Sequence, residues 1–130
     1  MTLVVDGNNV IGSVPDGWWR DRRGAAWRLL GRLQRFAVDH DGPVTVVFDV
    51  PDPELPEGEH DRVIVRYATR CGRDAADDRI VELLDEGLAG DPADVEVVTS
   101  DRALAAAARA RGARVTPAGT LLARLDDAGC

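Results

Sequence analysis

Short apolar runs alternate along the chain with longer stretches in which apolar residues recur every three or four positions. The short runs are nearly all apolar, which is typical of strands buried on both faces of a parallel sheet. They predict strands at 3–5, 44–48, 63–65, 95–99 and 114–116. The longer stretches predict helices at about 22–38, 75–88, 102–112 and 119–125. This alternation predicts an α/β fold with a mainly parallel sheet flanked by helices.

One segment follows neither pattern. Residues 50–60 contain three prolines and several acidic side chains, so we expect an irregular, mobile loop there.

Composition and charge narrow the choice of partners. The chain has 130 residues, 45% of them hydrophobic, so we expect residues 1–130 to form a single domain. Its 23 acidic residues outnumber 16 basic ones, all of them arginine, and the net charge is −7. A nucleic acid could therefore bind only through a local arginine patch or through metal ions.

The sequence lacks the features of membrane, targeted and disulfide-rich proteins. No apolar run approaches the roughly 18 residues of a membrane span. The apolar residues 1–5 are interrupted by Asp6 and are not accompanied by a basic stretch, so they do not resemble a targeting signal. We therefore expect a cytoplasmic protein that does not contact membranes. Cys71 and Cys130 are too few for a disulfide framework or a cysteine metal site, and we expect free thiols.

Three predicted strands end in an aspartate. Asp6, Asp49 and Asp101 each follow an apolar run directly or within two residues. The carboxyl ends of parallel strands share one edge of a sheet, where α/β folds bind ligands. A single such aspartate is usually a helix cap or a turn former. Three carboxylates that converge would repel one another unless a positive charge lies between them.

A fourth carboxylate comes from helical geometry. Asp77 precedes the predicted apolar stripe of the second helix by three, four and seven positions, so its side chain is expected on the same face. The stripe consists of Ile80, Val81, Leu84 and Leu88. Asp74 is the expected N-cap of this helix. Asp78 aligns with a solvated face, and we include it as the weaker candidate metal ligand.

Carboxylates without a matching set of histidines or cysteines suit a hard cation such as Mg²⁺ or Mn²⁺. Such an ion polarises phosphoryl oxygens and lowers the pKa of water. The inferred reaction is hydrolysis of a phosphodiester.

Four segments, in this order, resemble the YacP-like NYN ribonucleases, which are relatives of the PIN-domain nucleases. They are VDGNNVI at 5–11, VFD at 47–49, ADDRI at 76–80 and VTSD at 98–101. The resemblance implies a three-layer α/β/α sandwich whose five predicted strands have the order 3-2-1-4-5, and a metal-dependent endoribonuclease.

The resemblance also implies roles for individual residues. Asp6, Asp77 and Asp101 would hold the metal and Asp49 would support them. Asn9 would orient a ligand or a water molecule. Gly7 would keep the turn beside the metal free of a side chain, although an ordinary turn glycine is an equal alternative.

Two departures from the family pattern concern RNA binding. Asn8 stands where relatives often carry tyrosine, and the segment 51–61, commonly rich in lysine in the family, is acidic here. Other side chains could contact the substrate, namely Arg66, Arg70 and Arg73 for phosphates and Trp18 for a base. The arginines could equally be solvated or paired with nearby acids.

Other functions stay open at this point. A non-cleaving RNA- or ribosome-associated binding module with a vestigial acidic site fits the acidic loop and the net charge. A phosphohydrolase with an aspartyl nucleophile usually has a second aspartate two residues after the first, where this chain has Asn8. The oligomeric state is not predicted by any pattern.

Overall fold

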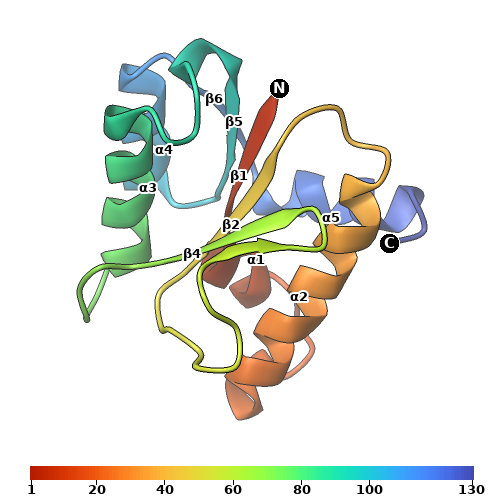
Figure 1. Cartoon of the computed structure of the whole chain (residues 1–130). Coiled ribbons are helices and arrows are strands. Elements are labelled where there is room, and N and C mark those ends of the chain that lie inside the picture. Colours follow the sequence, from red (N-terminus) through yellow and green to blue (C-terminus); the bar gives the residue numbers. More distant parts are fainter.

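Six strands form one sheet with the order β3-β4-β2-β1-β5-β6 in the computed structural model, which describes residues 1–130 (Figure 1). The strands are β1 (Thr2–Asp6), β2 (Val44–Phe48), β3 (Gly58–His60), β4 (Val63–Tyr67), β5 (Val95–Val98) and β6 (Arg114–Thr116). All neighbours pair in parallel except β3 and β4, which are antiparallel. The five predicted strands are confirmed in the predicted order, and β3 adds an edge strand.

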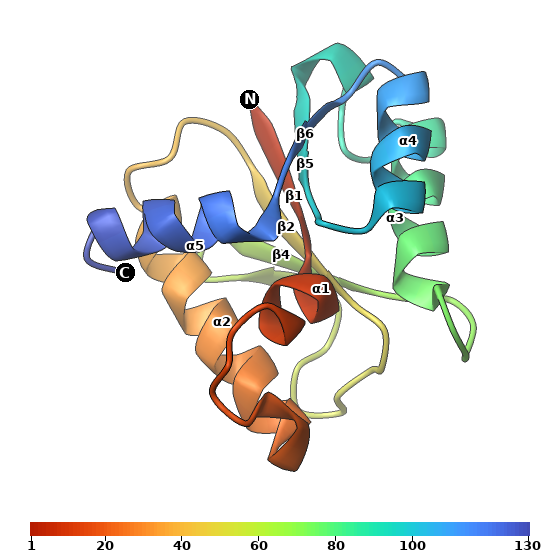
Figure 2. The ribbon, with the colours of Figure 1, turned by 180° about the vertical axis from the view of Figure 1, so that it is seen from behind.

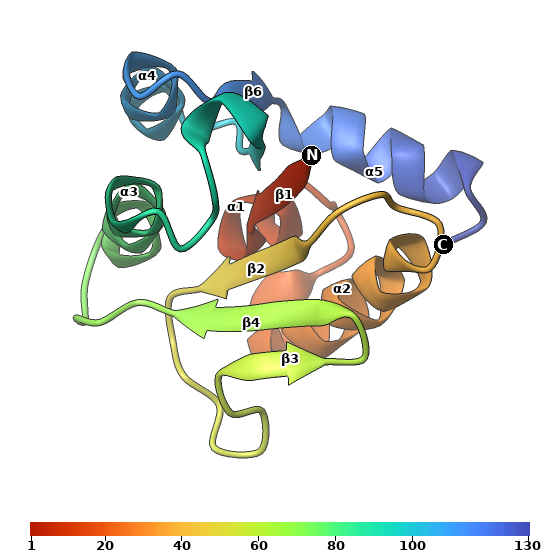
Figure 3. The same ribbon diagram turned by 45° about the horizontal axis from the view of Figure 1, so that its top comes forward.

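Helices cover both faces of this sheet, as predicted (Figures 2 and 3). They are α1 (Gly7–Gly12), α2 (Arg22–Ala37), α3 (Ala75–Glu86), α4 (Arg102–Ala110) and α5 (Ala118–Asp127), with short 3₁₀ turns η1 (Trp18–Arg20) and η2 (Pro92–Asp94). Helices α1, α2 and α5 lie on one face, and α3 and α4 lie on the other. No helix combines the length and the hydropathy that a membrane crossing needs. Cys71 and Cys130 are free.

Two hydrophobic cores explain why the central strands are apolar at every position. Leu3 and Val5 of β1 pack with α1, α2 and α5, while Val4 between them packs with α3 and α4. Successive side chains of a strand point to opposite faces, so a strand covered on both faces needs apolar residues throughout.

Helix α1 was not predicted. Its sequence GNNVIG consists mainly of residues with low helix propensity. Val10 and Ile11 nevertheless enter the first core, and their burial stabilises a helix that propensity does not favour. The strand-end aspartate Asp6 therefore leads directly into a helix.

The prediction of an irregular loop at 50–60 was wrong in part. Residues 58–60 form β3, which a two-residue turn joins to β4, and both turn residues, Asp61 and Arg62, have positive φ. Leu55 is only 2% exposed, and its carbonyl oxygen accepts a hydrogen bond from the hydroxyl of Tyr67 at 2.6 Å. The segment is thus anchored to the body of the protein by burial of one leucine.

The apolar stripe of α3 differs from the prediction at its end. The helix stops at Glu86 because Gly87 takes a left-handed conformation, with φ of 72°. Leu88 therefore lies beyond the helix and is 59% exposed, whereas Leu83 is buried in its place.

Candidate active site

Five aspartates line one pocket at the carboxyl edge of the sheet. The pocket has a volume of about 220 Å³ and lies where β1, β2 and β5 end, beside the N-terminal turns of α3 and α4. The aspartates are Asp6, Asp49, Asp74, Asp77 and Asp101. The parallel order of β2, β1 and β5 brings the three strand-end acids together, as the sequence predicted.

Asp6 is the most buried of these acids. It ends the central strand β1, is 3% exposed, and accepts a hydrogen bond from the hydroxyl of Thr99 at 2.9 Å. Burial raises the pKa of Asp6, hydrogen bonds from Thr99 and from the backbone of Asn9 oppose the rise, and the charges of Asp101 and Asp49 add to it, so that the pKa is about 6. Neutral hydrogen-bond donors therefore orient this carboxylate without supplying the positive charge that would neutralise it.

Asp101 begins α4 and belongs to the same hydrogen-bonded chain. One carboxylate oxygen, Oδ1, accepts from the backbone amide of Leu104 at 2.8 Å and caps the helix. The amide of Asp101 donates to the hydroxyl oxygen of Thr99 at 3.0 Å, and that hydroxyl donates to Asp6. Thr99 thus couples the positions of the two acids, and the second oxygen of Asp101 accepts no hydrogen bond.

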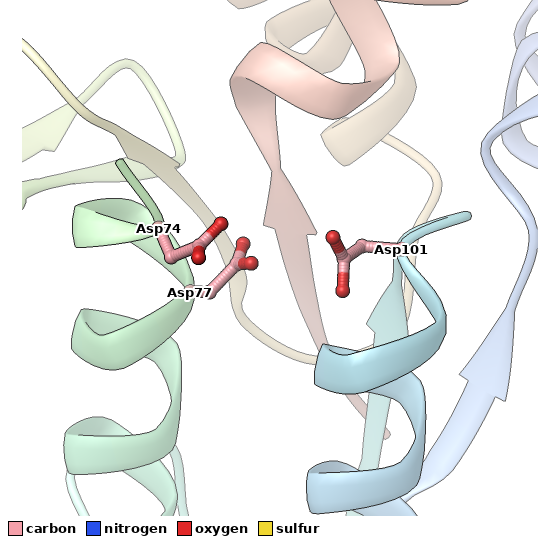
Figure 4. A group of neighbouring side chains, drawn as sticks. All are labelled: Asp74, Asp77 and Asp101. Carbon is pink, nitrogen blue, oxygen red and sulfur yellow. The ribbon is translucent and has the colours of Figure 1, made fainter. Parts of the chain in front are cut away.

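Asp74 and Asp77 face Asp101 from the first turn of α3 (Figure 4). One carboxylate oxygen from each of the three residues lies within 4.8 Å of the other two. Partial burial and, after it, the charges of Asp6, Asp101, Asp74 and Asp78 together raise the pKa of Asp77 to about 7. Repulsion of this kind is expected where carboxylates gather without a cation.

Asp74 is a site residue that the sequence analysis treated only as a helix cap. Its side chain makes no capping hydrogen bond and its backbone is left-handed, with φ of 61°. This conformation turns the carboxylate toward Asp77 and Asp101. An aspartate before a helix is so commonly a cap that no local signal distinguishes this one.

Asp78 was predicted as the weaker metal ligand, and the structure places it outside the pocket. It lies one helical position beyond Asp77, so its side chain points to a different side of α3 and pairs with the guanidinium of Arg70. Arg70 also donates to the carbonyl oxygens of Cys71 and Arg73 and so holds the loop before α3. The open alternative for Arg70, pairing with a nearby acid, is the one observed.

The other predicted substrate-binding residues are distributed unevenly. Arg73 lines the acidic pocket and forms no ion pair. Arg66 is half-buried on β4, in register with Val47, and does not line the pocket. Trp18 packs partly against the first core and lies outside the pocket as well.

The two asparagines after Asp6 tie the neighbouring strand ends to α1. The side-chain oxygen of Asn8 accepts from the amide of Asp49, and that of Asn9 accepts from the amide of Ser100, both at 2.8 Å. Both residues also line the pocket. Asn9 therefore positions the loop that carries Asp101, a contact that the resemblance did not indicate.

Gly7 does not serve the purpose that the resemblance suggested. A Cβ atom at this position would lie 2.6 Å from the Phe48 ring and 2.9 Å from the carbonyl oxygen of Val47. The missing side chain therefore leaves room for β2 rather than for a metal.

No arginine neutralises the five pocket acids, because none of them forms an ion pair. Clustered carboxylates with free oxygens are the donor set that Mg²⁺ and Mn²⁺ prefer. The residues present therefore fit a divalent cation, with Asp74, Asp77 and Asp101 as the group closest to one another.

Fold and pocket together define the class of the protein, an α/β domain with a nuclease-like acidic site at the carboxyl edge of its sheet. The family model of the YacP-like NYN domain matches residues 3–129, and the chain belongs to this family.

Solved structures of Rae1 (YacP) from Bacillus subtilis are among those similar to the chain. A mutant form is 26% identical, with a TM-score of 0.78 over 98% of this chain and 76% of that one. A second structure is 27% identical, with a TM-score of 0.75 over 99% of this chain and 75% of that one. No curated protein matches the chain.

Proposed function

We propose that this protein is a metal-dependent endoribonuclease that hydrolyses phosphodiester bonds of RNA in the acidic pocket. The observation that carries the proposal is the meeting of five carboxylates without a cationic partner, in a member of the YacP-like NYN domain family. Holding these charges together lowers stability, and a site of this kind is retained where a cation uses it.

Mg²⁺ or Mn²⁺ is the proposed cofactor. Asp74, Asp77 and Asp101 would hold it, with Asp6 beside them. A bound divalent ion supplies positive charge to a phosphodiester and lowers the pKa of water.

The residues of this chain would position the ion and the substrate. Thr99 orients Asp6, and the N-cap contact of Asp101 leaves one of its oxygens free to bind. Asn8 and Asn9 hold the loops that carry Asp49 and Asp101. Arg73, the one basic residue of the pocket, would contact a phosphate.

The test is cleavage of an unstructured RNA in Mg²⁺ or Mn²⁺ and in EDTA. We expect cleavage by the wild type in metal only, and a loss of at least about 100-fold in Asp77→Asn because a charged ligand is removed. Asp127→Asn removes an exposed, unpaired acid at the end of α5 and should leave cleavage unchanged. Equal cleavage by Asp77→Asn and the wild type would contradict the proposal.

A non-cleaving binding module is the second candidate, motivated by the net charge of −7, which weakens the RNA affinity that efficient cleavage needs. Its expected result differs clearly, since RNA would bind in EDTA as well as in metal and no product would form after long incubation. The acidic segment 51–61 supports this candidate less strongly than its sequence suggests. Arg23 pairs with Asp52 at 2.7 Å and with Glu54 at 2.6 Å, so part of the negative charge of the segment is neutralised.

A further inference from the structure

A second cavity lies beside the acidic pocket and is more than twice as large, with a volume of about 530 Å³. Its walls are the first part of α2 and residues 48–55. Asn8 and Asp49 line both hollows, so the two are adjacent. A polymer held in the acidic pocket therefore has a neighbouring space of the size that small organic ligands occupy.

An aromatic wall gives this cavity a preference for flat rings. Trp27 lies on α2 with its side chain 40% exposed, and its indole N–H donates to a carboxylate oxygen of Asp52 at 2.9 Å. The hydrogen bond fixes the orientation of the exposed ring before any ligand arrives. Phe48 and Tyr67, with ring centroids 6.3 Å apart, add two buried aromatic rings to the lining.

The polar groups at the rim fit a nucleotide. Arg22 and Arg23 stand on the side of α2, and Asn8 and Asp49 stand on the side of the acidic pocket. Arg22 forms no ion pair, and its guanidinium lies 5.4 Å from the centre of the Trp18 ring. Arg23 is already paired with Asp52 and Glu54, so Arg22 is the cation that this side of the rim offers to a phosphate. The other side offers amide and carboxylate groups to the edge of a base.

We propose that this cavity is a subsite for a nucleobase of the RNA, which stacks against Trp27 while the adjacent phosphodiester occupies the acidic pocket. The inference rests on the proposed function and adds a substrate contact to it. An RNA strand carries a planar ring next to every phosphate, which matches a ring-lined cavity next to an acidic pocket. Base stacking on an aromatic side chain also accepts all four bases.

The experiment uses one single-stranded RNA and a set of copies in which a single nucleotide near the cleavage site is abasic. In the wild type we expect one abasic position beside the cleavage site to lower kcat/KM about tenfold, the usual scale of a lost stacking contact. In Trp27→Ala we expect kcat/KM on the intact RNA to be about tenfold lower than in the wild type. Replacing the intact RNA by the abasic copy should then lower kcat/KM of this variant by less than about twofold. Trp27→Phe keeps a ring and should restore part of the difference.

A second pair of variants serves where Trp27→Ala folds poorly. Ala26→Leu narrows the cavity without removing a hydrogen bond and should reduce the abasic effect in the same direction. Ala106→Leu makes the same change on the exposed face of α4, outside the cavity, and should retain the wild-type effect.

Failure of this inference differs from failure of the proposed function. Cleavage with equal abasic penalties in the wild type and Trp27→Ala, or with no penalty at any position, would overturn the subsite and leave the nuclease intact. If no RNA is cleaved, the nuclease proposal fails, and dissociation constants of the same RNAs in Mg²⁺ decide the subsite. A tenfold difference in affinity between the intact and the abasic RNA that Trp27→Ala abolishes supports the subsite, whereas equal or absent binding overturns it.

Discussion

Asp74 shows at the scale of one residue how the site lowers stability. A non-glycine residue with φ of 61° is uncommon, and such a conformation costs about 1–3 kcal/mol. The residue gives no helix cap in return, and its carboxylate lies next to two others. Strain and repulsion at the same position are typical of a functional residue and not of a structural one.

Gly7 yields a prediction at the same scale. We expect Gly7→Ala to lower the free energy of unfolding by about 1–3 kcal/mol, because the new methyl group meets the buried Phe48 ring and the Val47 backbone. Chemical denaturation followed by circular dichroism measures the change.

Gly119→Ala is the matched control for this prediction. It adds the same methyl group in the first turn of α5, where no atom lies within 4 Å, and should stabilise the protein by up to about 1 kcal/mol through helix propensity. Equal effects of the two substitutions would show that close packing with β2 does not require Gly7.

At the scale of elements, the segment between β2 and β3 is held by contacts that its sequence does not indicate. Trp27 and Arg23 of α2 bind Asp52, and the amide of Tyr67 donates to Glu57 at 2.8 Å. The hydrogen bonds from Trp27 and Arg23 lower the pKa of Asp52 to about 2. Acidic side chains that looked repulsive in the sequence thus fasten the segment to the helix and the sheet.

The burial of Leu55 also holds this segment against the core, and it can be tested by substitution. We expect Leu55→Ala to lower the free energy of unfolding by about 2–5 kcal/mol, as for other fully buried leucines. Val50→Ala in the same segment, where the side chain is 71% exposed, should change it by less than about 0.5 kcal/mol. A similar small effect of both, in urea melts, would mean that the segment is not packed against the core.

At the scale of the whole molecule, the acidic pocket makes stability depend on pH. The pKa is about 6 for Asp6 and about 7 for Asp77 in the folded protein, against about 3.9 for an aspartate in an unfolded chain. Between these values the folded state binds more protons than the unfolded state. The contribution of both groups is therefore full below about pH 4 and is lost as the pH rises through 6 and 7.

We accordingly expect the free energy of unfolding in EDTA to fall between about pH 4.5 and pH 7.5, and Asp77→Asn to make this slope shallower. Urea melts at several pH values provide the measurement. Asp52, Asp85 and Glu96, whose pKa values are lowered by hydrogen bonds from their partners, contribute a constant stability over this range and lose it only at lower pH. An unchanged slope in Asp77→Asn would contradict the assignment.

Added Mg²⁺ should reverse the loss. We expect a larger rise in Tm at pH 7.5 than at pH 5.5, because a cation binds the ionised carboxylates and competes with protons. Because this measurement needs no RNA, it tests metal binding independently of RNA cleavage.

The sequence by itself determined the alternation of strands and helices and the placement of acids at the ends of three strands. Those features follow from continuous apolar runs, from a period of about 3.6 residues and from the residue that ends each run, all of which are set by neighbours along the chain. Only the tertiary structure decided that Asp74 joins the pocket and leaves its helix uncapped, and that Asp78 turns away to Arg70. It also decided that Trp27 meets Asp52, 25 positions away, to form the second cavity. Contacts between residues so far apart leave no local period, because they depend on where the sheet places its strands and loops.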